Sequence, residues 1–290
     1  MTRTTHGPGA PLNIAADILP VKLGTHPPRA EGALHLVAGK RGSGTSIAGL
    51  RQQGSLKALF PRQHADSLEM VLLNTAGGLT GGDRMTVKLE ADVDAHLVVS
   101  TQAAERACRA MTDSQAKVDF ALNVGPGARI DWLPQETILF EGAALNRRLR
   151  ADLAMDARLF VVEPVILGRP AMGEVLHAAA LWDRWEVRRG KALVFADALR
   201  LEGDITATML RAATAGGAGA FASILCVAPD AERHLPPLRA LLPPSAGASL
   251  IRDGVLFGRI LATDGFELRR TLIPVIEYLT GASLPKVWRL

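Results

Sequence analysis

The sequence predicts a mainly β protein with about two α-helices near its C-terminus, folded as one elongated domain. Short apolar runs of strand length recur between turn-forming residues from about residue 33 onward. The 28 glycines and 17 prolines make up about 15% of the 290 residues, a little above average usage, which indicates many turns. Helical signals are few and lie near the C-terminus.

The expected strands are short aliphatic or β-branched segments bounded by Gly, Asp, Asn or Pro. A hairpin is expected where a glycine-bearing loop separates two such segments, at 185–187 and 193–196. The other expected strands are 34–37, 70–73, 86–89, 97–99, 118–122, 130–133, 138–140 and 159–167.

A weak internal repeat runs through the middle of the chain. Residues 94–99, 127–132 and 156–161 each consist of a turn, a small residue, a basic or His residue and then an apolar strand. The spacings of 33 and 29 residues are typical of stacked β units that bury their apolar faces on one another. Three imperfect copies are equally compatible with hairpins that look alike in any β protein.

Two segments carry helical signals. The first runs from Asp230, a candidate N-cap, to Leu242, and its two adjacent prolines are expected to break it. The second begins at Asp264 with a capping box to Glu267 and ends at Gly281. An apolar stripe lies on one face of the second helix, and Pro274 is expected to kink it. The stripe consists of Leu268, Leu272, Ile276 and Leu279.

Composition predicts the domain organisation and the cellular compartment. Residues 1–30 are rich in Gly, Pro and Thr without a period, so we expect a flexible N-terminal arm followed by a single β domain over 31–290. Two distant cysteines form no disulfide framework, and the sequence has no signal peptide and no apolar run of about 18 residues. We therefore expect a cytoplasmic protein without a membrane partner.

The net charge of +4 leaves two interpretations of the basic residues open. Short clusters such as Arg147-Arg148-Arg150 are either solvated strand ends and turns or a surface for phosphate or an acidic partner. Aromatic residues make up only 4% of the chain, which argues against a nucleic-acid partner because single strands are bound by stacking on aromatic rings.

The most glycine-rich segment is residues 74–83, which follow an apolar strand. Gly77, Gly78, Gly81 and Gly82 are expected to form a structural turn with left-handed backbone and close chain approach. A phosphate-binding nest is the alternative. The glycine spacing matches neither the Walker motif nor the dinucleotide-binding motif. A strand rather than a helix is expected to follow, so there is no helix N-terminus to bind an anion and the turn is favoured over the nest.

The sequence contains no recognisable set of catalytic residues, and we expect a protein that is not an enzyme. There is no nucleophile elbow, and Cys108, although it lies between arginines, is best explained as a packed thiol. The seven histidines never pair at helical or strand spacing, so no high-affinity metal site is predicted. Several carboxylates stand beside or near glycine or proline, a set better suited to passing a divalent ion along than to storing it. They are Asp83, Glu136, Glu141, Glu163 and Glu174.

Six blocks in order from about residue 33 to the end resemble the urease accessory protein family UreD, called UreH in some bacteria. They include the run 72–83 with 100–105, the block 132–143, the block 167–174, residues 183–187 and the closing 284–288. Each block is weak by itself, and the combination covers nearly the whole chain. The sequence departs from the family pattern in Ala76, Cys108 and Glu141, and the last of these changes side-chain reach.

The resemblance implies an elongated, helix-like stack of β-strands with two helices, and a scaffold in urease maturation. In that family the protein joins UreF and the GTPase UreG, and the complex docks on the urease apoprotein. Nickel then moves into urease in a step driven by GTP hydrolysis, and no cofactor is tightly bound. A dimer within the UreD-UreF-UreG complex is one arrangement the resemblance allows. The C-terminal helical region is expected to contact UreF.

The resemblance also implies a route for nickel inside the protein. We expect Asp83, Glu141 and Glu174, with Glu136 as a fourth, to line it, because successive carboxylates bind a cation enough to admit it and too weakly to trap it. The alternative function is a non-catalytic β-solenoid module that binds proteins and has no metal role.

Overall fold

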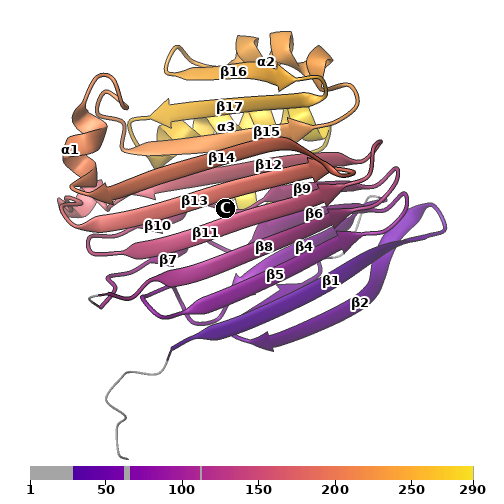
Figure 1. Ribbon diagram of the computed structural model, residues 1–290, viewed down its shortest axis with the longest axis horizontal. Helices are drawn as coiled ribbons and strands as arrows, with labels where there is room; N and C mark the ends of the chain where they lie inside the picture. The colour runs from indigo at the N-terminus through magenta and orange to yellow at the C-terminus, as the bar shows by residue number, and fades with distance from the viewer. Residues whose placement is uncertain (1–28, 62–65, 112, 290) are drawn as a thin grey trace, which may run out of the picture.

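Over residues 68–189 the chain passes repeatedly from one to the other of two β-sheets that lie face to face, as Figure 1 shows. The computed structural model describes residues 29–61, 66–111 and 113–289, and all but the last two positions of the expected arm 1–30 lie outside them. One sheet has the order β14-β13-β11-β8-β5-β1-β2 within these residues. Its strands are β1 (Glu31–Arg41), β2 (Gly44–Gly54), β5 (Arg84–Ala91), β8 (Ala116–Val124), β11 (Ala144–Leu153), β13 (Ala179–Arg189) and β14 (Ala192–Gly203).

The second sheet has ten described strands in the order β16-β17-β15-β12-β9-β6-β4-β3, with β10 and β7 added beside β12. Its central strands β4, β6, β9 and β12 run parallel to one another. Its strands are β3 (Leu56–Leu59), β4 (Leu68–Asn74), β6 (His96–Thr101), β7 (Glu105–Ala107), β9 (Arg129–Leu133), β10 (Thr137–Leu139), β12 (Arg158–Leu167), β15 (Ala220–Val227), β16 (Ala246–Arg252) and β17 (Val255–Ala262).

The three repeat copies form the starts of β6, β9 and β12, which are adjacent in the second sheet. His96 pairs with Arg129, and Arg129 pairs with Arg158, so the copies lie in register. The small residue before each strand is an alanine at most 1% exposed, because the chain turns there from one sheet into the other. The repeat therefore reflects stacked coils that share one core between the sheets.

One of the three helices adds Ile205 and Met209 to this core, and the other two pack in a second core. They are α1 (Ile205–Leu210), α2 (Leu235–Leu241) and α3 (Gly265–Thr280), with single-turn 3-10 helices η1 (Pro170–Met172), η2 (Ala231–His234) and η3 (Lys286–Arg289). α1 is an addition to the two expected helices. The first expected helix is divided into η2 and α2, and its two prolines lie at the start of α2, where a missing N–H costs nothing. Asp230 makes no capping hydrogen bond at η2 and pairs with Arg158 instead.

α3 covers the outer face of the ten-stranded sheet. Asp264 accepts a hydrogen bond from the Glu267 N–H, and Gly281 ends the helix in the left-handed conformation, as the sequence predicted. The predicted apolar stripe, together with Val275, is buried in a second core that also contains strand residues of this sheet. The apolar face of α3 is therefore buried against its own chain.

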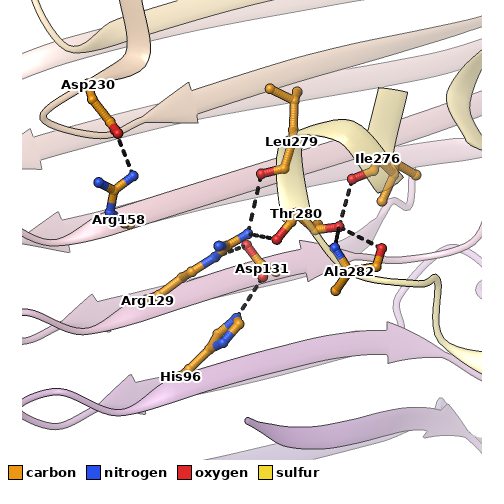
Figure 2. Close-up of polar contacts among 9 residues, drawn as sticks. All are labelled: His96, Arg129, Asp131, Arg158, Asp230, Ile276, Leu279, Thr280 and Ala282. Carbon is orange, nitrogen blue, oxygen red and sulfur yellow. Dashed lines mark hydrogen bonds and ion pairs between the residues drawn. The ribbon is translucent and has the colours of Figure 1, made fainter. Parts of the chain in front are cut away.

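A polar cluster fixes the C-terminal end of α3 to the strands, as Figure 2 shows. Arg129 donates from Nη2 to the carbonyls of Leu279 (3.4 Å) and Thr280 (3.1 Å), which have no partner within the helix. Asp131 orients this guanidinium at 2.8 Å and also contacts His96 Nε2 at 2.7 Å. Repeat positions on neighbouring strands therefore bind the helix end.

The glycine-rich segment is a turn between β4 and β5. Gly77, Gly78 and Gly82 have φ angles of 77°, 153° and 95°. A Cβ at Gly78 would lie 2.9 Å from the Arg106 carbonyl oxygen and 3.3 Å from Cys108 Sγ. At Gly81 a Cβ would lie 2.1 Å from Ser114 Oγ. Two chain segments approach here as closely as glycine allows.

We predict that Gly78→Val lowers the free energy of unfolding by about 3 kcal/mol, because it combines backbone strain with a clash against main chain. Gly173→Val is the control, since its φ is 67° and a Cβ there would meet nothing within 4 Å. The control should cost only about 1 kcal/mol. Urea unfolding of both variants measures this, and equal losses would show that the close approach carries no cost.

Candidate functional site: a cavity between the sheets

A cavity of about 270 Å³ lies between the two sheets beside the glycine-rich turn. Its walls are largely apolar, and its lining includes the exposed residues Gly77, Gln102, Ala103 and Arg106, so it opens toward solvent there. Buried polar groups line its inner part, namely Trp132, Thr137, Arg147 and Glu163. A volume of this size has room for several water molecules.

Arg147 joins the two sheets at the inner part of the cavity. It lies on β11 at 4% exposure, so this member of the basic cluster is not solvated, whereas Arg148 and Arg150 are exposed. Its Nη1 donates to Glu163 Oε2 on β12 in the opposite sheet. Its Nη2 and Nε donate to Asp183 at 2.6 and 3.2 Å, and Asp183 is its in-register neighbour on β13. One guanidinium therefore serves two buried carboxylates.

Two indole groups complete this network. Trp132 Nε1 donates to Glu163 Oε1 at 2.7 Å, and Trp185 Nε1 donates to Asp183 Oδ1 at 3.2 Å. Burial raises the pKa of Glu163 from its ordinary value of 4.5 to about 7, against the attraction of Arg147. The negative charge of Asp183, which shares the Arg147 guanidinium, also raises this pKa. Near neutral pH Glu163 is therefore poised between its charged and neutral forms.

A second carboxylate, Glu105 on β7, lies at the outer part of the cavity. Its Oε2 accepts a hydrogen bond from Asn74 Nδ2 at 3.2 Å, and burial raises its pKa. Beside it, Arg106 Nη2 donates to the Gly77 carbonyl at 2.6 Å. The glycine-rich turn and β7 thus form one edge of the opening, with a carboxylate just inside it.

None of the four carboxylates expected along the nickel route appears in the lining of this cavity. Asp83 is 3% exposed and accepts hydrogen bonds from the backbone N–H groups of Ala30 and Thr80, both at 2.8 Å, which closes the glycine-rich turn. Glu136 is 4% exposed and pairs with Arg269 of α3 at 2.9 and 2.8 Å. Both side chains tie parts of the fold together.

Glu141 and Glu174 lie next to each other in the loops at one end of the strands. The Glu141 N–H donates to Glu174 Oε1 at 3.1 Å, and Glu141 Oε2 accepts from the Ala178 N–H at 3.2 Å. Arg169 pairs with Glu174 through two hydrogen bonds and holds the pKa of that carboxyl below its usual range. The role of all four carboxylates in a nickel route stays a prediction.

Sequence reasoning overlooked Arg147, Asp183 and Glu105. A signal for Arg147 exists, because residues 145, 149, 151 and 153 are apolar at alternate positions and place residue 147 on the same inward face. Charged residues at the intervening positions obscured this strand. No comparable local pattern marks Glu105, whose position depends on the pairing of β7 with β10.

Among the described residues, no three His, Cys, Asp or Glu side chains are grouped so that they could hold a metal ion. No described helix combines the length and apolar character needed to cross a membrane.

The fold and cavity define a class of protein: a two-sheet stack of β coils with buried charged groups facing an internal space. Residues 30–289 match the family model described as UreD urease accessory protein. A urease accessory protein UreD from Rhizobium leguminosarum bv. viciae is 45% identical over 271 residues, covering 93% of this chain and 99% of that one. A UreD from Chelativorans sp. (strain BNC1) is 48% identical over 263 residues, covering 90% and 94%. The chain belongs to the UreD family of urease accessory proteins.

We predict that Glu163 makes stability depend on pH in a specific direction. Its folded pKa lies above the unfolded value, so the stability linked to its neutral form is present below about pH 4.5 and is lost as pH rises through about 7. Urea unfolding should show wild type losing stability relative to Glu163→Gln between about pH 5 and pH 7. Glu90→Gln is the control, because Lys88 and His35 lower the pKa of this carboxyl. A pH-independent gap between wild type and Glu163→Gln would contradict the raised pKa.

Proposed function

We propose that this protein is a scaffold in urease maturation that joins UreF and the GTPase UreG and conveys nickel into the urease apoprotein in a GTP-dependent step. Membership of the UreD family supports a role in urease maturation. The finer assignment is supported by the cavity, whose carboxylates are separate from one another and partly compensated by hydrogen bonds. Such groups bind a hard or borderline cation transiently.

Within this proposal, Glu105 and Glu163 are the carboxylates that an ion meets inside the cavity. Glu105 lies where the cavity opens and Glu163 where it is most buried. A cation near Glu163 favours its charged form, so the raised pKa couples nickel entry to proton release. Asp83, Glu136, Glu141 and Glu174 remain candidates for parts of the route outside the cavity. The protein itself makes and breaks no covalent bond, and it acts in the cytoplasm.

We predict that Glu105→Gln lowers urease activation about tenfold while the complex with UreF and UreG stays intact. The assay is reconstitution of apo-urease with UreF, UreG, GTP, nickel and bicarbonate. Glu69→Gln is a matched control, because burial also raises the pKa of Glu69, which lies outside the cavity lining on β4.

The same assay separates the competing routes. Normal activation by Glu105→Gln, together with a loss in the double variant Asp83→Ala and Glu174→Ala, would place the route outside the cavity. Activation that survives in every carboxylate variant would favour the alternative function, a binding module without a metal role.

We further propose that UreF binds the exposed side of α3. Removing residues 264–290 would strip the second core, so loss of binding after that deletion would only report unfolding. Phe266, at the first turn of α3, is 74% exposed and offers an apolar contact without a core role.

We predict that Phe266→Ser weakens UreF binding by about tenfold, because a central aromatic residue of an interface contributes at least 1.4 kcal/mol. Met172→Ser is the matched control at 75% exposure on η1. Calorimetric titration with UreF measures both. Equal affinity of the two variants would move the interface away from α3.

A further inference from the structure

The outer face of the seven-stranded sheet carries a concentrated positive charge that the proposed function does not use. On β5, β8, β11 and β13 side chains alternate between the core and this face. Figure 1 shows no helix over these four strands. Outward residues that are in register across the four strands form rows, which we number from the start of β5. The first three rows hold six basic side chains, which we call the basic face: Arg84, Lys88, Lys117, Arg148, Arg150 and Arg184.

These three rows hold two acidic side chains, Asp119 and Glu186, which leaves them a net charge of +4. The fourth outward row adds Glu90, Asp152 and Arg188, so the outer surface of the four strands carries +3. Lys88 pairs with Glu90 and Arg184 with Glu186, at 2.8 and 2.9 Å. The other four basic residues of the face form no ion pair within the described part of the chain. Their charge is therefore available to a partner.

The register places basic side chains next to one another on this face. Arg84 lies opposite Lys117 and Arg148 opposite Arg184, while the acidic Glu31 and Asp119 lie on the other sides of Arg84 and Arg148. Alternation between core and surface would be satisfied by any polar residue at these positions. The excess of basic over acidic side chains is therefore a property of this surface and not a requirement of the sheet.

The chemistry of the face favours an acidic protein. Surfaces that bind single-stranded nucleic acid use exposed aromatic rings, and the one aromatic residue on these outward rows, Trp182, lies under the Arg200 guanidinium at 5.2 Å. No large apolar side chain on β5, β8, β11 or β13 is strongly exposed, so the face offers nothing to insert into a bilayer. Exposed guanidinium and ammonium groups without ion-pair partners suit a surface of carboxylates.

We propose that the basic face, centred on Arg84, Lys117 and Arg148, is a docking surface for the acidic face of a partner protein. Charges at these positions speed and orient the encounter, and their contribution falls with ionic strength. This contact is separate from the cavity and from α3, both of which lie away from the outer face of this sheet.

The test compares two triple variants of the full chain with the same change in net charge. The patch variant is Arg84→Gln, Lys117→Gln and Arg148→Gln. The control variant is Lys191→Gln, Arg211→Gln and Arg252→Gln, all exposed and outside the face. Binding to fluorescent poly-L-glutamate and to duplex DNA is measured by anisotropy at low and high salt.

We expect the patch variant to bind poly-L-glutamate about tenfold more weakly and the control variant less than about twofold more weakly. We expect both variants to melt within a few degrees of wild type, because exposed substitutions away from the core change stability little. Equal losses in the two variants, or no binding to poly-L-glutamate, would overturn the proposal. Tighter binding to duplex DNA would assign the face to nucleic acid instead, and a lower melting temperature of the patch variant would assign it to folding.

Discussion

The register of the stacked coils is the constraint on which the rest of this structure depends. Parallel pairing of β6, β9 and β12 aligns equivalent positions of successive coils, so each column of side chains has one environment along the stack. Inward columns form the shared core, while the outward columns of one sheet receive α3 and those of the other face solvent. The register therefore determines which side chains are neighbours of a charged residue. It accounts for the Arg147–Asp183 pair between the sheets and for the neighbouring basic residues on the outer face.

The buried network around Arg147 contributes little to stability, and its main effect is on the protonation of a carboxylate. Desolvating three charged groups costs several kcal/mol per ion before their attraction is counted, and apolar residues of similar size would serve the core at least as well. What the network supplies is a carboxylate, Glu163, whose charge responds near neutral pH and which faces a cavity. In a protein proposed to pass nickel onward, such a group can bind and release a cation without holding it.

Strands with apolar runs were predictable from local sequence, and strands with charged or glycine-containing faces were not. The strands 70–73, 97–99, 130–133 and 159–167 lie within β4, β6, β9 and β12. β11 was missed because Arg147, Arg148 and Arg150 interrupt its apolar alternation, and β2 because most of its residues are exposed at a sheet edge. In the same way, Asp230 has the sequence of a cap but pairs with Arg158, since tertiary contact outweighed the local preference.

The sequence by itself determined the β class, the turn at the glycine-rich segment, the boundaries of α3 and the resemblance to UreD, because each rests on local conformational preference or on ordered blocks of residues. Only the tertiary structure decided which carboxylates face the cavity. In the sequence, Glu163 lies within the expected strand 159–167 and Glu136 lies between two expected strands, but neither context tells which side chain faces a cavity. The two differ because one points between the sheets toward Arg147 and the other points outward to Arg269, and that choice is made by strand pairing over long sequence separations.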